Sequence, residues 1–101
     1  MTEAIEITTF KLMRGHTCAD FIEANADVDA WLRQQPGFKS RRIAQRSDGV
    51  VVDTLLWHSS TQAESAMHRL MDELRDSPVH ALINQRTVDW TVADVFHALE
   101  R

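Results

Sequence analysis

The chain lacks the sequence features that mark several common classes of protein. Its single cysteine, Cys18, excludes a disulfide within the chain and fits a reducing compartment, so we expect a cytoplasmic protein. Lys and Arg (11) are outnumbered by Asp and Glu (15), and the formal net charge of −4 argues against a general nucleic-acid binder. No stretch approaches the ~20 apolar residues of a membrane span. The N-terminal residues lack the basic start and apolar run of a signal peptide, so we expect none.

The remaining composition is that of a globular protein. Of the 101 residues, 44% are hydrophobic and 26% are charged, and we expect one domain over residues 1–101. A domain of this size buries only roughly two thirds of its unfolded surface. Its core is therefore adequate but thin.

The segment Val50–Trp57 is the clearest strand. It is rich in β-branched and large apolar residues, follows the turn dipeptide Asp48-Gly49, and ends before a run of Ser and Thr. Alternation places one set of residues on each face: Val51, Asp53, Leu55 and Trp57 on the first, and Val50, Val52, Thr54 and Leu56 on the second. Both sets are mainly apolar, so we expect both faces to be covered.

The rest of the chain predicts an alternation of strands and helices. Thr17 with Asp20 and Thr61 with Glu64 have the spacing of helix capping boxes. In chain order we expect a strand from Ile5 to Met13, a helix from the Thr17 cap to about Gln35, a strand from Phe38 to Arg46, the strand Val50–Trp57, a helix after Thr61, a short helix through Val79, Leu82 and Ile83, and a strand through Val88, Trp90 and Val92. This order predicts an α+β, ferredoxin-like fold with a four-stranded antiparallel sheet.

Two amphipathic helices can cover only one face of such a sheet. The other face would carry Ile7, Val50, Val52 and Leu56 with no third layer to bury them. A second copy of the same sheet is the simplest cover. We therefore expect a homodimer in which two sheets close an α+β barrel.

Three short motifs point to a known family. They are Leu32-x-x-x-Pro36-Gly37-Phe38 at the end of the first helix, the Asp48-Gly49 hairpin, and Trp57-x-Ser59 before an Ala-rich helix. With them the chain resembles the antibiotic biosynthesis monooxygenase-like family of the dimeric α+β barrel superfamily, from about Ile5 to Phe96. The motifs are structural, so they indicate the fold more strongly than the activity.

The resemblance implies a pocket between helices and sheet. Members that oxidise polyketide quinone precursors without metal or flavin hold the substrate and its oxyanion with an Asn and a Trp, four residues apart on the strand after the hairpin. The matching residues here are Asp53 and Trp57. Those members also carry a Tyr early in the following helix, where this chain has Ala63. An Asp donates a hydrogen bond only when it is protonated.

A second branch of the family degrades haem and is a poor match. It requires an Asn on the first strand, where this chain has Thr8, and a His ligand for iron that has no clear counterpart. The five histidines also lack the spacing of paired metal ligands on one helix. We therefore expect no haem, no other cofactor and no metal.

Asp53 and Trp57 are the predicted catalytic residues. In a pocket that excludes water, burial raises the pKa of a carboxylate and suits it to act as a general base toward an acidic C–H or a phenol. Trp57 could stack on a planar ligand. The structural alternative is that Asp53 pairs with an arginine such as Arg42 or Arg86 while Trp57 fills the core.

Five further residues are predicted to bind substrate. Asn25 lies on the apolar face of the first helix and could orient a carbonyl, although a buried Asn that bonds only to backbone is an equally common case. For Met67, core filling is the alternative. The full set is Asn25, Thr8, Phe10, Met67 and His80.

Three functions fit these patterns to different degrees. The leading hypothesis is a cofactor-independent monooxygenase-like protein that acts on a small aromatic or quinone-type metabolite. The second is a non-catalytic dimeric domain that binds a small apolar molecule in the same pocket. An RNA-recognition module shares the order of elements, but it needs exposed aromatic residues on the first and third strands. Phe10 and Trp57 are expected to face the helices instead.

Overall fold

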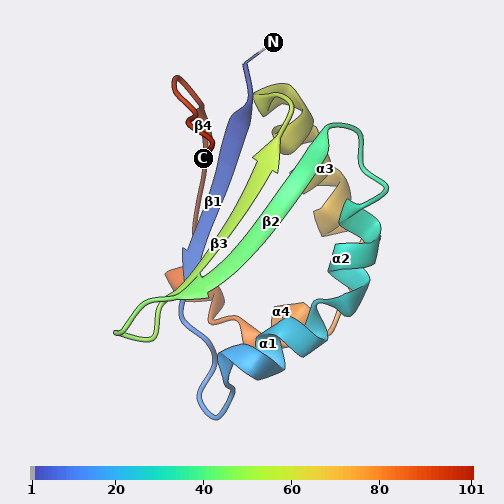
Figure 1. Ribbon diagram of the computed structural model, residues 1–101. Helices are drawn as coiled ribbons and strands as arrows, with labels where there is room; N and C mark the ends of the chain where they lie inside the picture. Colours follow the sequence, from blue (N-terminus) through green and yellow to red (C-terminus); the bar gives the residue numbers. More distant parts are fainter. Residues whose placement is uncertain (1) are drawn as a thin grey trace.

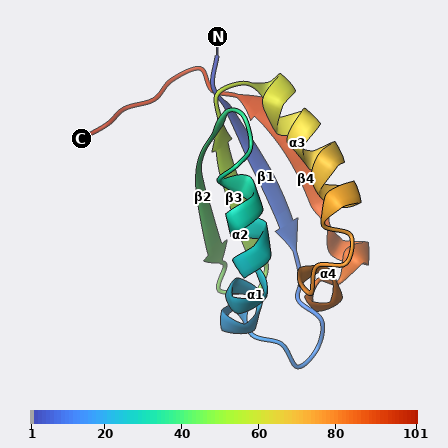
Figure 2. The same cartoon turned by 90° about the vertical axis from the view of Figure 1, so that its right-hand side faces the viewer.

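The computed structural model describes residues 2–101, which form one antiparallel sheet with helices packed on one side (Figures 1 and 2). The strands are β1 (Ala4–Phe10), β2 (Phe38–Gln45), β3 (Val51–Trp57) and β4 (Asp89–Asp94). The helices are α1 (Cys18–Ala24), α2 (Ala26–Leu32), α3 (Ser60–Glu73) and α4 (Val79–Leu82), with a 3-10 turn at Gln85–Thr87. The strand order is β2-β3-β1-β4, with every neighbour antiparallel. The predicted ferredoxin-like α+β class is confirmed.

Strand β3 lies inside the sheet and shows the predicted alternation. Val51, Asp53, Leu55 and Trp57 are buried beneath the helices, while the residues between them are half-buried on the opposite face. Phe10 of β1 is also buried on the helix side, with its ring 5.0 Å from that of Phe21 in α1. Phe10 and Trp57 therefore face the helices, as expected.

Strand β2 contains a bulge that changes which of its residues face the helices. Phe38 lies opposite Trp57, but the next pair along the ladder is Ser40 with Leu56. Lys39 is the extra residue, and it shifts the alternation of every residue after it. Arg41, opposite Leu55, therefore faces the helices, and Arg42 faces the other side.

The predicted single helix after Thr17 is wrong, because it is two helices. The Thr17–Asp20 capping box forms as expected at the start of α1. Asn25 then ends α1 and precedes α2, with φ −88° and ψ 5°. Its side-chain Nδ2 donates to the Phe21 carbonyl at 2.7 Å, which is the local competition with helical hydrogen bonding that Asn side chains provide.

Two other predicted boundaries are also corrected. Helix α3 begins at Ser60, and its cap is Ser59, whose Oγ accepts from the Gln62 N–H at 3.3 Å, instead of the expected pair Thr61 and Glu64. Strand β1 ends at Phe10 instead of Met13, because the Lys11 N–H bonds to the Thr87 side chain at 2.8 Å and leaves the ladder. A local cap therefore sets the start of α3, whereas a tertiary partner sets the end of β1.

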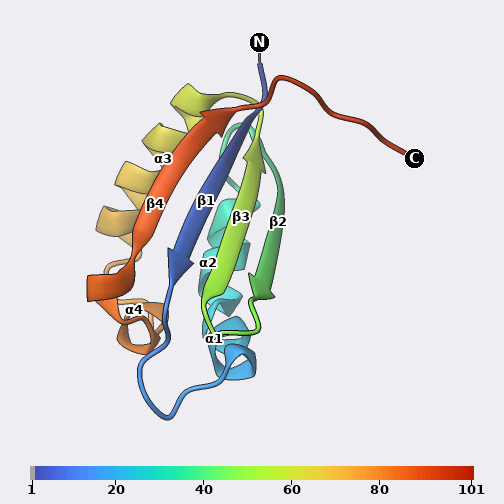
Figure 3. The same cartoon turned by 90° about the vertical axis from the view of Figure 1, so that its left-hand side faces the viewer.

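The face of the sheet away from the helices has no cover within residues 2–101 (Figure 3). Ile7, Val52 and Leu56 lie there and are only partly buried. The part of the chain that follows β4 runs away from the sheet (Figures 2 and 3), and Phe96 within it is 96% exposed. Among the described residues, no helix has the length and apolar character that crossing a membrane requires.

Gly37 joins α2 to β2 under two constraints. Its φ is +84°, and a Cβ there would lie 2.1 Å from Oε1 of Gln62 at the start of α3. Gly15 has a φ of +88° but open space around it. We predict that Gly37→Ala lowers the free energy of unfolding by more than Gly15→Ala, for which the left-handed backbone costs about 1 kcal/mol. Equal losses in urea denaturation would show that Gln62 moves aside freely.

Candidate functional site

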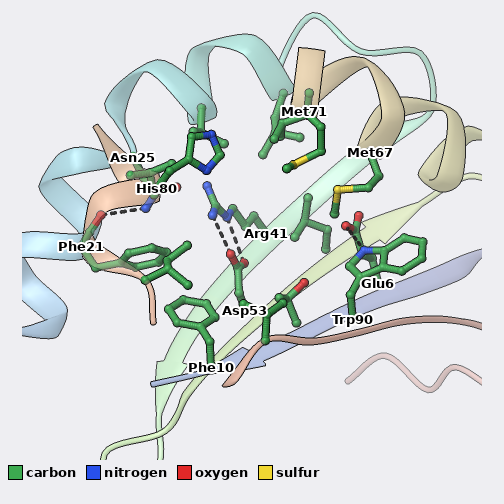
Figure 4. A pocket seen from close by; sticks show the side chains of 18 of the residues that line it. Glu6, Phe10, Phe21, Asn25, Arg41, Asp53, Met67, Met71, His80 and Trp90 are labelled. Carbon is green, nitrogen blue, oxygen red and sulfur yellow. Dashed lines mark hydrogen bonds and ion pairs between the residues drawn. The ribbon is translucent and has the colours of Figure 1, made fainter. Parts of the chain in front are cut away.

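A cavity of about 380 Å³ lies between the sheet and the helices (Figure 4). This volume is within the range of pockets that hold small organic ligands. Most of its lining is apolar, with Phe10 and Leu55 from the sheet and Phe21, Leu70 and Val79 from the helices. The polar lining residues are Glu6, Thr8, Asn25, Arg41, Asp53, His80 and Gln85.

Asp53 is bound by Arg41 in a bidentate ion pair. Arg41 Nε donates to one carboxylate oxygen at 3.0 Å and Nη2 to the other at 2.6 Å. Nη1 of the same guanidinium donates to Asp29 of α2 at 2.9 Å. Burial would lower the pKa of Arg41, but its hydrogen bonds and charge interactions with Asp53 and Asp29 outweigh burial and raise it.

The Arg41–Asp53 pair corrects the expected arginine partner of Asp53. The predicted alternative partners, Arg42 and Arg86, are wrong, because the bulge in β2 turns Arg41 to the inner face in place of Arg42. The catalytic hypothesis predicted that Asp53 faces a cavity. The structural alternative predicted that Asp53 pairs with an arginine. The structure shows an Asp53 that is paired and also lines the cavity.

Glu6 is a second buried carboxylate at the cavity, and the sequence interpretation missed it. It is 4% exposed, and its two oxygens accept hydrogen bonds from different indoles, Trp57 Nε1 and Trp90 Nε1, each at 2.8 Å. Within residues 2–101 it forms no ion pair. The charges that shift its pKa are those of Asp53 and Arg41. The alternation that turns Thr8 and Phe10 inward also turns Glu6 inward, so the signal was present.

Burial raises the pKa of Glu6 above its ordinary value. The indole hydrogen bonds of Trp90 and Trp57 oppose this shift, the negative charge of Asp53 adds to it, and Arg41 opposes it. Because the pKa is higher in the folded state, the stability that Glu6 contributes is fully present below its unfolded pKa. That contribution is lost as the pH rises through the folded pKa. An ionised Glu6 is thus held at a cost to the fold.

Asn25 carries a buried oxygen with no hydrogen-bond partner among the described residues. The residue is 1% exposed and lines the cavity, and its Nδ2 is bound to the Phe21 carbonyl. Since a carbonyl only accepts, the amide orientation is determined, and Oδ1 is the unpaired atom. An unpaired buried acceptor costs stability and is ready to accept from a ligand hydroxyl or N–H. The Asn25 amide thus bonds to the backbone through Nδ2, as the structural alternative predicted, and its Oδ1 remains available to a ligand.

The other residues predicted to bind substrate also reach the cavity. Thr8 and Phe10 line it from β1, Met67 from α3 and His80 from α4. His80 Nε2 lies 2.9 Å from the Leu74 carbonyl, to which it can only donate, so Nδ1 is the free acceptor when the ring is neutral. Whether any of them contacts a substrate stays a prediction.

Trp57 does not lie where a ligand could stack on it. It is 1% exposed, its ring meets Phe38 edge-on at 5.5 Å, and it is not part of the cavity lining. Its link to the cavity is the hydrogen bond to Glu6. Trp90 on the edge strand β4 lines the cavity instead, so a ligand there would meet Trp90 (Figure 4).

Within residues 2–101, no three His, Cys, Asp or Glu side chains lie close enough together to hold a metal ion. The polar groups of the cavity include one ion pair, one carboxylate held by neutral donors and one unpaired amide oxygen. This set can bind hydrogen-bond donors, stabilise a negative charge and accept a proton.

The fold is shared with known oxygenases over the whole chain. SnoaB, a cofactor-independent oxygenase from Streptomyces nogalater, is 17% identical, with 100% of both chains covered and a TM-score of 0.75. The monooxygenase ActVA-Orf6 of Streptomyces coelicolor, solved with the ligand nanaomycin D, is 21% identical over 99% of this chain and 93% of its own, with a TM-score of 0.67. A protein of unknown function from Nitrosomonas europaea is 9% identical, with 100% and 96% covered and a TM-score of 0.69.

These similarities establish the class of fold. No protein-family model and no curated protein matches the sequence. The structural matches bear out the fold that the resemblance implied: the chain has the α+β ferredoxin-like fold of solved oxygenases and of a putative antibiotic biosynthesis monooxygenase from Nitrosomonas europaea. At these identities the shared fold includes both oxygenases and proteins of unknown function.

We expect the Arg41–Asp53 ion pair to stabilise the fold. Asp53→Asn removes the charge that compensates a buried guanidinium, and we expect a loss of about 3 kcal/mol in the free energy of unfolding. Asp29→Asn is the matched control, because it removes the charge of the other partner of Arg41. The Asp29 side chain is 46% exposed. An exposed pair of this kind contributes about 0.5 kcal/mol. Similar losses for both variants in urea denaturation would contradict a dominant role for Asp53.

Proposed function

We propose that the protein binds a small aromatic or quinone-type molecule in the cavity and oxygenates it without a metal or organic cofactor. The observation that carries the proposal is the mainly apolar cavity, open to solvent on one side, whose polar lining includes Arg41, Asp53, Glu6 and Asn25. Apolar walls can hold a ring system. The polar groups offer the means to remove a proton and to stabilise the resulting anion.

Arg41 and Asp53 act together in this proposal. Three of the five guanidinium N–H groups of Arg41 are taken by Asp53 and Asp29, which leaves one on Nη1 and one on Nη2. These can donate to a phenolate or enolate oxygen as its negative charge develops. Asp53 fixes the guanidinium in place, and Asn25 Oδ1 accepts from a polar edge of the ligand. Trp57 acts through its hydrogen bond to Glu6.

Oxygen uptake tests this function directly. We expect at least one member of a panel of phenols, hydroquinones and naphthols to raise oxygen consumption above the rate in buffer. Val88→Trp should abolish the increase, because Val88 lines the cavity, is 39% exposed and would carry the larger ring into it. Ala98→Trp is the matched control in the exposed C-terminal segment and should leave the rate unchanged.

The second candidate is a dimeric binding domain without catalysis. The pairing of Asp53 with Arg41 favours it, since both carboxylate oxygens are already occupied by guanidinium N–H groups. Calorimetric binding of a panel member that Val88→Trp prevents, with no oxygen uptake by any member, would select this candidate. Absence of both binding and oxygen uptake would contradict both functions.

We further propose that the protein is a homodimer, in which the bare face of the sheet packs on a second copy. Ile7, Val52 and Leu56 are only partly buried on that face, and burial against a second sheet would remove apolar area from water. Val52→Glu should convert a dimer into a monomer in sedimentation velocity, because it places an unpaired charge in the interface. Gln34→Glu adds the same charge at an exposed position after α2 and should remain dimeric. A monomeric wild-type protein at micromolar concentration would contradict the proposal.

A further inference from the structure

Two carboxylates reach the cavity, and they are held in opposite ways. Both oxygens of Asp53 accept from a cation, Arg41, at 3.0 and 2.6 Å. Both oxygens of Glu6 accept from neutral indoles, Trp57 and Trp90, at 2.8 Å. A cation neutralises the charge that it binds, whereas a neutral N–H orients a carboxylate and leaves its net charge in place.

The two indoles hold Glu6 from two sides of its own strand. Glu6 lies on β1, Trp57 on β3 and Trp90 on β4, so the carboxylate is fixed by the strands that pair with β1 on either side. Each oxygen has used one of its acceptor positions on an indole and keeps another. Since Glu6 lines the cavity, a bound ligand can reach those remaining positions.

We propose that Glu6, in place of the predicted Asp53, is the general base of the cavity and accepts the proton of a ligand hydroxyl. The ligand O–H bond breaks with its electron pair staying on the ligand oxygen, and a new O–H bond forms on Glu6. The ligand class is a neutral phenol, whose phenolate then has the free N–H groups of Arg41 nearby in the same cavity. This inference rests on the proposed oxygenase function and assigns its proton-transfer step.

The surroundings of Glu6 favour proton uptake by its carboxylate. Burial raises the pKa of Glu6, the negative charge of Asp53 adds to this rise, and the indole hydrogen bonds and Arg41 oppose it. Helix α3 contributes Met67, Leu70 and Met71 to the same lining, and α4 contributes His80. A base with a pKa that burial has moved toward neutral pH is better matched to a phenol than an ordinary surface carboxylate.

Nuclear magnetic resonance of the wild-type protein tests the proton acceptor without any activity. The indole N–H signals of Trp57 and Trp90 should shift together as pH changes, with one midpoint above the ordinary range for Glu, because burial raises the pKa of Glu6. Trp31 is the internal comparison, because its indole donates to Glu73, an exposed carboxylate, at 3.4 Å. Glu6→Gln should remove the shared transition. Two indoles that do not titrate together, or that do so in the ordinary Glu range, would overturn the proposal.

The pH dependence of oxygen uptake tests the catalytic role. With a phenol that the wild-type protein consumes, kcat/KM should fall at low pH with the same midpoint as the indole signals. Glu6→Gln should lower kcat by at least about 100-fold, the usual contribution of a general base, with a much smaller change in KM. Glu64→Gln, an exposed change on α3, should retain full activity.

Asp53→Asn separates the two carboxylates. If Glu6 is the base, this variant keeps a low-pH limb even where its activity is reduced, with the midpoint moved to lower pH because the charge of Asp53 no longer raises the pKa of Glu6. A low-pH limb that disappears in Asp53→Asn and survives in Glu6→Gln would overturn the proposal while leaving the oxygenase function intact. If no phenol is consumed, the oxygenase function fails and the catalytic role of Glu6 fails with it, whatever the indole titration shows.

Discussion

The ion pair between Arg41 and Asp53 is the interaction on which the arrangement of the cavity depends. It joins β2 to β3 through two hydrogen bonds and β2 to α2 through Asp29. A buried guanidinium without these partners would cost several kcal/mol. The side chain can reach them only because the bulge at Lys39 turns it inward, so a local irregularity of the sheet and a tertiary ion pair require each other.

The charged residues on the inner face of the sheet have different partners and therefore different chemistry. Arg41 with Asp53 forms a nearly neutral pair that still offers N–H donors. Glu6, one strand away, is bound by neutral indoles and keeps a raised pKa. Two carboxylates placed in unlike environments are suited to unlike tasks, one to position a cation and one to exchange a proton. The helical side adds an unpaired acceptor, Asn25 Oδ1, at the break between α1 and α2.

Much of the fold could be predicted from period-2 and helical patterns. The order of elements, the inward set of β3 and the Thr17 cap are local features, and the structure bears them out. The helix break at Asn25 and the end of β1 at Phe10 were missed, because each depends on a hydrogen bond that competes with the regular pattern. Asp53 and Asn25 were correctly expected to be buried, since polar residues on apolar faces are visible in the sequence.

The sequence by itself determined which residues face the helices wherever alternation is unbroken, including Glu6, Thr8 and Phe10 on β1. Only the tertiary structure decided which charges meet. Arg41 and not Arg42 reaches Asp53 because of one extra residue in β2, and Trp57 meets Glu6 and Phe38 instead of the cavity. The physical reason is that a strand's period sets the face of a side chain, whereas its partner depends on register, bulges and the helices packed above it.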